Sequence, residues 1–282
     1  RTLPAMPGSD EVREVEALNL AAIATARHVI YLENQYLAAR GLAEALATRL
    51  REPDGPEVII VLPPRSSESR LEQGSMDSAR ERLVRLLWDA DEHGRLGIYW
   101  PVTKGGVSVY VHSKVMIVDD RFLRIGSSNL NNRSLGFDSE CDLALEAWAD
   151  DRDDIRRHIE HMRDDLLAEH LGVSVDAVRS EAAQRQSTVQ AVEALRGTGR
   201  SLRKFTEFMV AADAGPFAEN DLMDPDHVPA SLAQTLCSTT IAAMLWPLTQ
   251  AAPGLWSTIR AITEQVRTFA PDLERMRTGT VD

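Results

Sequence analysis

Residues 106–129 read GVSVYVHSKVMIVDDRFLRIGSSN, two apolar segments separated by a polar turn. The first segment is rich in Val, Ile and Tyr, and we predict a strand from Gly106 to Asp119. The pair Asp119-Asp120 predicts the turn, and residues 122–125 predict the returning strand. A β-hairpin is therefore expected over these residues.

Polar side chains of this hairpin are spaced so that they converge. Side chains at i and i+2 of a strand share a face, so His112 and Lys114 are expected to project together. Gly126 lets the backbone come close to a ligand, and Ser127 and Asn129 share one side of the chain after it. A histidine, a cation and neutral donors gathered in this way suit a phosphodiester.

The pattern HxKxxxxD at residues 112–119, followed by GSxN at 126–129, resembles the signature of the phospholipase D superfamily. Residues 30–36 (IYLENQY) resemble a strand found upstream of the second signature in phospholipid-cleaving members. Residues 131–140 resemble the family's downstream pattern. The resemblance covers roughly residues 1–170. It implies phosphodiester cleavage through a phosphohistidine, without a metal or another cofactor.

The resemblance also implies roles for the candidate catalytic residues. His112 would be the general acid if a preceding signature carries the nucleophile, and in a homodimer it could play either role. Lys114 would neutralise a phosphoryl oxygen. Glu140 falls where the family has the acid that orients the imidazole. Asp119 belongs to the signature and is predicted to act mainly as a turn acid within it.

Four further residues are candidates for substrate binding. Ser127 and Asn129 would donate hydrogen bonds to the phosphoryl oxygens. Glu33 and Gln35 lie in the IYLENQY segment, where they either line the site or cap a strand.

One half of the expected site is missing from this sequence. The family builds one site from two signatures, but among the 7 histidines only His112 is followed two residues later by lysine. We therefore expect the C-terminal half of a two-signature enzyme, and residues 1–4 resemble the close of a longer strand. The alternative is a nuclease-type phosphodiesterase that completes its site across a homodimer. A non-catalytic scaffold is the third possibility.

The composition of the chain limits the classes of molecule that it is expected to bind. A net charge of −12 over 282 residues argues against nucleic acid as a partner, because a phosphate backbone attracts a basic face. The expected substrate is a phospholipid at a membrane surface, cleaved by water or exchanged with another alcohol. A cytoplasmic or peripheral-membrane location would suit it. The sequence contains no Cys/His cluster with metal-ligand spacing, no P-loop and no dinucleotide-binding pattern.

Alternating strand and helix patterns predict an α/β half-domain over residues 1–172, with a mixed sheet flanked by helices. Residues 173–282 are predicted to be a mainly helical C-terminal extension, with one helix over 174–196. Within it, residues 230–259 carry no charge, and they either pack on the catalytic domain or lie at a lipid interface. Further predictions are a loop over 65–77 and a helix over 78–93.

Overall fold

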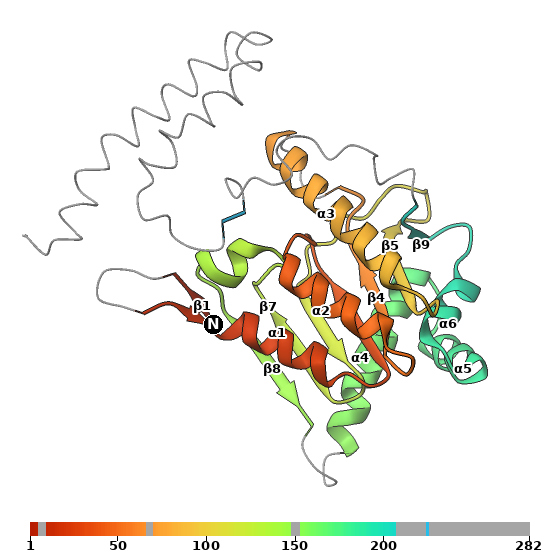
Figure 1. Ribbon diagram of the computed structural model, residues 1–282. Helices are drawn as coiled ribbons and strands as arrows, with labels where there is room; N and C mark the ends of the chain where they lie inside the picture. The colour runs from red at the N-terminus through yellow and green to blue at the C-terminus, as the bar shows by residue number, and fades with distance from the viewer. Residues whose placement is uncertain (5–9, 66–69, 148–152, 207–223, 226–282) are drawn as a thin grey trace, which may run out of the picture. The chain divides into compact units, whose positions relative to one another are not determined.

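The computed structural model of the chain describes residues 1–4, 10–65, 70–147, 153–206 and 224–225. These residues form a seven-stranded sheet with the order β8-β7-β6-β3-β4-β5-β9 (Figure 1). Strands β3, β4 and β5 are parallel, and every other neighbouring pair is antiparallel. The predicted mixed sheet is therefore confirmed. Its strands are β3 (Val29–Glu33), β4 (Glu57–Val61), β5 (Leu96–Val102), β6 (Val115–Val118), β7 (Phe122–Gly126), β8 (Asp142–Glu146) and β9 (Ser201–Lys204).

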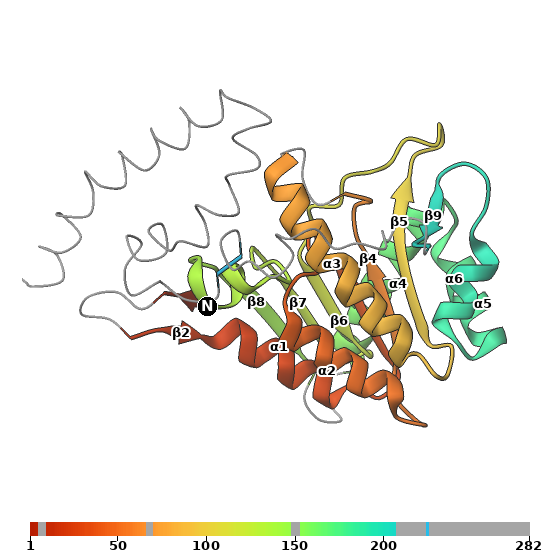
Figure 2. The same ribbon diagram turned by 45° about the horizontal axis from the view of Figure 1, so that its top comes forward.

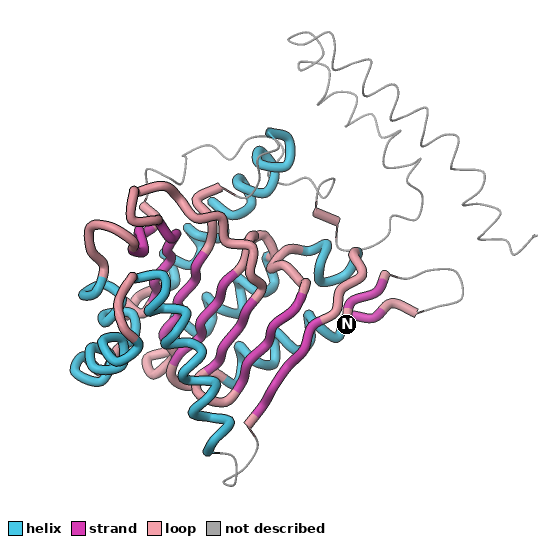
Figure 3. The backbone as a smooth tube through the Cα atoms, turned by 180° about the vertical axis from the view of Figure 1, so that it is seen from behind, coloured by secondary structure: helices cyan, strands magenta, loops and turns pink. Residues whose placement is uncertain are grey.

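Helices cover both faces of the sheet, as Figures 2 and 3 show from two sides. Alternate residues of β3 enter two separate cores, Ile30 and Leu32 in one and Tyr31 in the other. Both faces are buried, which is why β3 and β4 are apolar along most of their length. The first core is covered by α1 (Glu14–Thr25), α2 (Arg40–Arg51) and α3 (Arg70–Ala90), and the second by α4 (Asp153–Leu171), α5 (Val175–Arg185) and α6 (Thr188–Leu195).

A short strand pair and a π-helix lie beside the main sheet. Strand β1 (Thr2–Leu3) pairs with β2 (Val12–Arg13). The backbone of Thr2 also exchanges two hydrogen bonds with that of Glu140, just before β8. The π-helix η1 (Arg133–Phe137) follows the GSxN segment. None of the described helices has the length and apolar character needed to cross a membrane.

Two predicted boundaries are wrong. Strand β6 begins at Val115 rather than Gly106, because its neighbour β3 ends at Glu33, the partner of Val115, and leaves the residues before it without a ladder. Helix α3 begins at Arg70, so the predicted loop over 65–77 is helical in its second part.

The expected domain boundary at residue 172 falls inside one compact unit. Helices α5 and α6 pack on the sheet, and β9 pairs antiparallel with β5. The predicted helix over 174–196 is two helices, separated at Gln186, whose φ is +55°. Residues 207–223 and 226–282, including the uncharged stretch 230–259, lie outside the described residues.

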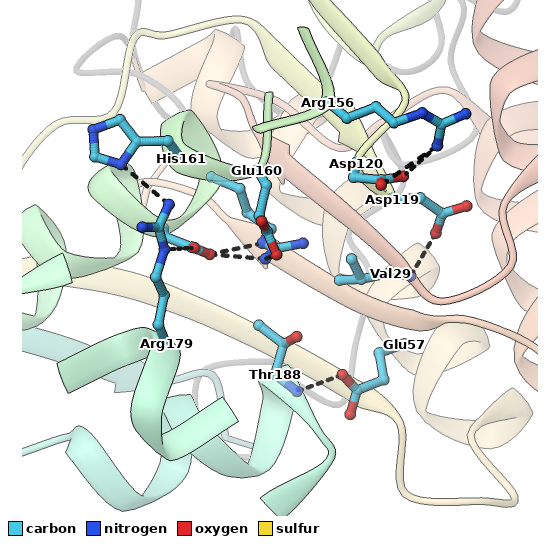
Figure 4. A network of polar contacts seen from close by, with 11 residues as sticks. Val29, Glu57, Asp119, Asp120, Arg156, Glu160, His161, Arg179 and Thr188 are labelled. Atoms are coloured by element: carbon cyan, nitrogen blue, oxygen red, sulfur yellow. Dashed lines mark hydrogen bonds and ion pairs between the residues drawn. The ribbon is translucent and has the colours of Figure 1, made fainter. Parts of the chain in front are cut away.

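Asp119 joins the β6–β7 turn to the start of β3. Its carboxylate accepts hydrogen bonds from the backbone N–H groups of Arg27, His28 and Val29, at 2.7–3.0 Å. The bond to Val29 is drawn in Figure 4. Asp119 has a φ of +55°, a conformation that Asp and Asn tolerate better than other side chains. The neighbouring Asp120 instead pairs with Arg156 of α4 at 3.3 Å.

Replacing Asp119 with Ala should lower the free energy of unfolding by about 2–4 kcal/mol, because three backbone donors lose their acceptor. Urea unfolding followed by circular dichroism measures this change. Asp120→Ala is the matched control and should cost less than about 1 kcal/mol, because it removes only a partly exposed ion pair. Equal losses for the two variants would contradict the structural role of Asp119.

Candidate active site

The candidate residues meet at one edge of the sheet because β6 is antiparallel to both of its neighbours. Strands β3 and β7 end at this edge, and β6 and β8 begin there. Asp119 is the exception, since it lies in the turn at the opposite edge. The candidates at the site edge are Glu33 and Gln35 around the end of β3, His112 and Lys114 before β6, Ser127 and Asn129 after β7, and Glu140 before β8.

His112 and Lys114 lie in the loop that leads into β6 rather than on a strand. His112 is exposed, and its ring stacks on Tyr110 with centroids 6.3 Å apart. Lys114 is buried, and its Nζ donates a hydrogen bond to the backbone carbonyl of His112 at 2.8 Å. The two side chains expected to project together are thus linked through the backbone of the histidine.

The electrostatic surroundings of His112 favour its neutral form. Partial burial lowers the pKa of His112 below its ordinary value, and the positive charge of Lys114 lowers it further. Burial also lowers the pKa of Lys114, an effect that the nearby Glu140 opposes. A neutral imidazole at pH 7 is a competent nucleophile and proton acceptor.

Glu140 is hydrogen-bonded to the GSxN segment. The Ser127 hydroxyl donates to the Glu140 carboxylate and accepts from the backbone N–H of Cys141 at 3.1 Å. Among the described residues, no hydrogen bond joins Glu140 to His112, so the orienting role of this acid stays a prediction. The Asn129 side-chain oxygen is buried and has no hydrogen-bond partner within the described residues.

Glu33 and Gln35 lie behind the His112 loop. Glu33 accepts a hydrogen bond from the Ser113 hydroxyl at 2.5 Å, and Gln35 donates one to the Tyr110 hydroxyl at 2.6 Å. These contacts place both side chains against residues that flank His112. Their expected role in substrate binding stays untested.

Asn34 completes the connection between this segment and the signature. It is fully buried, and its side-chain oxygen accepts hydrogen bonds from the backbone N–H groups of Leu130 and Tyr36, both at 3.1 Å. The end of β3 is thereby attached to the GSxN segment as well as to the His112 loop.

Arg124 and Asp142 are part of the site edge, although sequence reasoning missed them. Arg124 is fully buried, and its guanidinium lies 3.4 Å from the Asp142 carboxylate. Burial lowers the pKa of Arg124, and Asp142 opposes this effect. Asp142 also accepts hydrogen bonds from the backbone and the hydroxyl of Ser128. An arginine at an inward-facing position of an apolar strand was the signal available in the sequence.

A polar cleft lies between α4 and α5, away from this edge. Its buried Asp164 pairs with both Arg163 and Arg179, and Arg179 also contacts His161 (Figure 4). The charges of this cleft are therefore largely paired with one another. Within the described residues, no group of three His, Cys, Asp or Glu side chains is arranged to hold a metal ion.

The fold and the site edge together define an α/β domain that carries groups suited to a phosphodiester. A family model described as Phospholipase D matches residues 100–215. Phospholipase D delta of Arabidopsis thaliana is 26% identical over 223 residues, which are 58% of this chain and 26% of that protein. Phospholipase D alpha 1 of Zea mays is 36% identical over 89 residues, which are 30% of this chain and 10% of that protein.

Solved structures give partial matches. The phospholipase D family member Nuc from Salmonella typhimurium has 20% identity and a TM-score of 0.39, covering 53% of this chain and 84% of that chain. Phosphatidylserine synthase from Haemophilus influenzae has 17% identity and a TM-score of 0.43, covering 65% of this chain and 45% of that chain.

The chain is similar in sequence to phospholipase D proteins, and the family model matches it over residues 100–215, less than half of its length. It spans less than a third of the length of the curated relatives that it matches.

Replacing Lys114 with Met should raise the pKa of His112, because one of the two causes that lower it is removed. The pKa should stay below the ordinary value of a histidine, since partial burial remains. A titration of the His112 imidazole followed by NMR measures both values. A wild-type pKa at or above about 6.5 would show that these surroundings do not act on the histidine.

Gly126 is required by the close approach of Asp142. A Cβ at position 126 would lie 1.5 Å from the Asp142 carboxylate and 2.6 Å from its Cα. Gly126→Ala should therefore cost about 1–3 kcal/mol of stability. It should also displace Asp142 from Ser128.

Gly41→Ala is the matched control for this substitution in a urea unfolding experiment. A Cβ at position 41, in the first turn of α2, meets no atom within 4 Å. Ala is also the better helix former, so this variant should be neutral or gain up to about 1 kcal/mol. Similar results for the two glycines would count against the close-approach argument.

Proposed function

We propose that this chain contributes one half of a two-histidine site that hydrolyses or exchanges the headgroup phosphodiester of a phospholipid. The observation that carries the proposal is the meeting of His112, Lys114, Ser127, Asn129 and Glu140 at one sheet edge. The second histidine would come from a preceding half of a longer chain or from a second copy of this one.

The reaction needs two imidazoles with opposite protonation. A neutral histidine attacks phosphorus, forming an N–P bond as the bond to the leaving oxygen breaks, while a protonated histidine gives its proton to that oxygen. Water or another alcohol then attacks the phosphohistidine and passes its proton to the second imidazole. Hydrolysis and headgroup exchange differ only in this acceptor.

His112 could act as the nucleophile or as the general acid, because the charge of the substrate would change its pKa. Partial burial and the charge of Lys114 lower its pKa and so favour the neutral form in the free chain. A phosphodiester carries a negative charge, and an opposite charge nearby raises the pKa of an imidazole. In a two-signature assembly His112 would therefore gain the proton that it gives to the leaving group.

The groups around the histidine suit the developing charge. Lys114 would neutralise a phosphoryl oxygen once its Nζ turns from the His112 carbonyl to the substrate. Ser127 and Asn129 would donate hydrogen bonds to the same oxygens. His112 and Ser127 are both exposed, so a second half can reach them.

A phospholipid is favoured over a nucleic acid by two observations. The segment IYLENQY resembles the one in phospholipid-cleaving members, and its buried residues contact the His112 loop. The net charge of −12 opposes binding of a polyanion.

The test combines the mass of the purified chain by light scattering with choline release from phosphatidylcholine vesicles. A homodimer should release choline, and His112→Ala should reduce the rate by at least about a thousandfold. A monomer should be inactive until a first-signature half is added. His93→Ala is the matched control, since His93 is exposed and no lysine follows two residues later.

Two outcomes would contradict the proposal. One is choline release that His112→Ala leaves unchanged. The other is a chain that cleaves single-stranded DNA but no phospholipid, which would assign it to the nuclease class.

A further inference from the structure

A buried carboxylate behind the His112 loop has no part in the chemistry proposed above. Glu33, at the end of β3, is 3% exposed and accepts three side-chain hydrogen bonds. The donors are the Tyr31 hydroxyl at 2.5 Å, the Ser113 hydroxyl at 2.5 Å and His170 Nε2 at 2.8 Å. They belong to three different parts of the fold: β3, the loop before β6, and the last turn of α4.

Glu33 is ionised in this arrangement. Burial by itself would raise its pKa, but the hydrogen bonds that it accepts, the one from His170 first, lower the pKa below the ordinary value. Burial, and then the charge of Glu33, raise the pKa of Tyr31, which therefore remains a donor. A buried charge is stable only when it is fully hydrogen-bonded, so each donor is held in place as firmly as the carboxylate is.

Ser113 connects the buried Glu33 carboxylate to the loop that carries His112 and Lys114. It stands between His112 and Lys114 in the chain, and its hydroxyl bonds Glu33. Two residues further on, Val115 begins β6 and is the direct ladder partner of Glu33. The loop is thus fixed at the residue between its two reactive side chains, which sets where the flanking residues lie.

The arrangement differs from a nucleophilic triad. The carboxylate stands between the serine and the histidine, and both hydrogen bonds end on it. His170 therefore does not take the proton of Ser113, as the base of a triad would. Its contact with Glu33 instead ties α4 to the loop that carries His112.

We propose that His170, Glu33 and Ser113 form a positioning relay that holds His112 and Lys114 in their reactive geometry. This rests on the proposed function only in taking His112 as the reacting group. His170 is then a second functional histidine, outside the HxKxxxxD signature and 58 residues after His112 in the sequence. It acts through the carboxylate and does not touch the substrate.

The relay is tested by substitutions at its two ends. Ser113→Ala cuts the contact with the loop, and His170→Leu removes the donor from α4. In both variants the loop loses its fixed position, so the pKa of His112 should rise toward the ordinary histidine value as burial and the contact with Lys114 weaken. NMR titration of the imidazole of the purified chain measures this shift without any need for activity.

A conservative variant and a matched control separate positioning from simple stability. His170→Gln retains a donor near the position of Nε2, so it should keep the wild-type titration of His112. Glu193→Gln is the control, since Glu193 accepts a hydrogen bond from the buried Tyr99 at 2.8 Å but has no described contact with the loop. It should lower the melting temperature and leave His112 unchanged.

Kinetics on the active assembly give the second readout. Ser113→Ala and His170→Leu should lower kcat about ten- to a hundredfold while KM changes less than about threefold, because misplacement of a reacting group affects the chemical step. The relay is overturned if both variants lose melting temperature as Glu193→Gln does but keep the wild-type pKa of His112. If His112 shifts as expected while no substrate is cleaved, the relay stands and the proposed function fails.

Discussion

The site depends on one constraint, the insertion of β6 antiparallel between β3 and β7. Two strands then end where a third begins, so segments distant in the sequence meet at one sheet edge. Strands β3 and β6 are apolar along most of their length and buried on both faces, so most of the polar groups of the site lie at or just beyond the strand ends. The carboxylate of Asp119 secures the opposite edge by binding the first backbone N–H groups of β3. Residues of the signature therefore contact both ends of β3, with Asp119 at its start and Ser113 at its end.

The three residues after Leu32 show how a buried polar segment can organise a site. Glu33 is hydrogen-bonded to Ser113 within the signature, while Asn34 and Gln35 are hydrogen-bonded to Leu130 and Tyr110, which lie beside it in the sequence. Unpaired polar groups are costly in such a place, so each of these contacts also restricts its partner. A segment whose polar residues are expected either to line the site or to cap a strand can therefore also act by positioning the residues around it.

Most of the fold and part of the site could be predicted from the sequence. The mixed sheet, the helices on both faces and the signature residues follow from local patterns with a short period. The start of β6 could not be predicted, because it is set by where β3 ends. Strand β9 was missed because its residues, SLRK, are not apolar and it is recruited by β5. The contacts of Glu33 join residues 80 and 137 positions apart, and no local pattern records such pairs.

The close approach of Asp142 to Gly126 links two positions that a signature search treats separately. Only glycine fits at position 126, because the Asp142 side chain from the neighbouring strand occupies the space where a Cβ would lie. Asp142 in turn pairs with the buried Arg124. A relative with Ala or Ser at the first position of GSxN should therefore carry a smaller residue at the position of Asp142. Such a relative should also have an uncharged side chain in place of the arginine. The residue at the first position of GSxN is thus constrained by two residues outside the motif, one of them on the neighbouring strand.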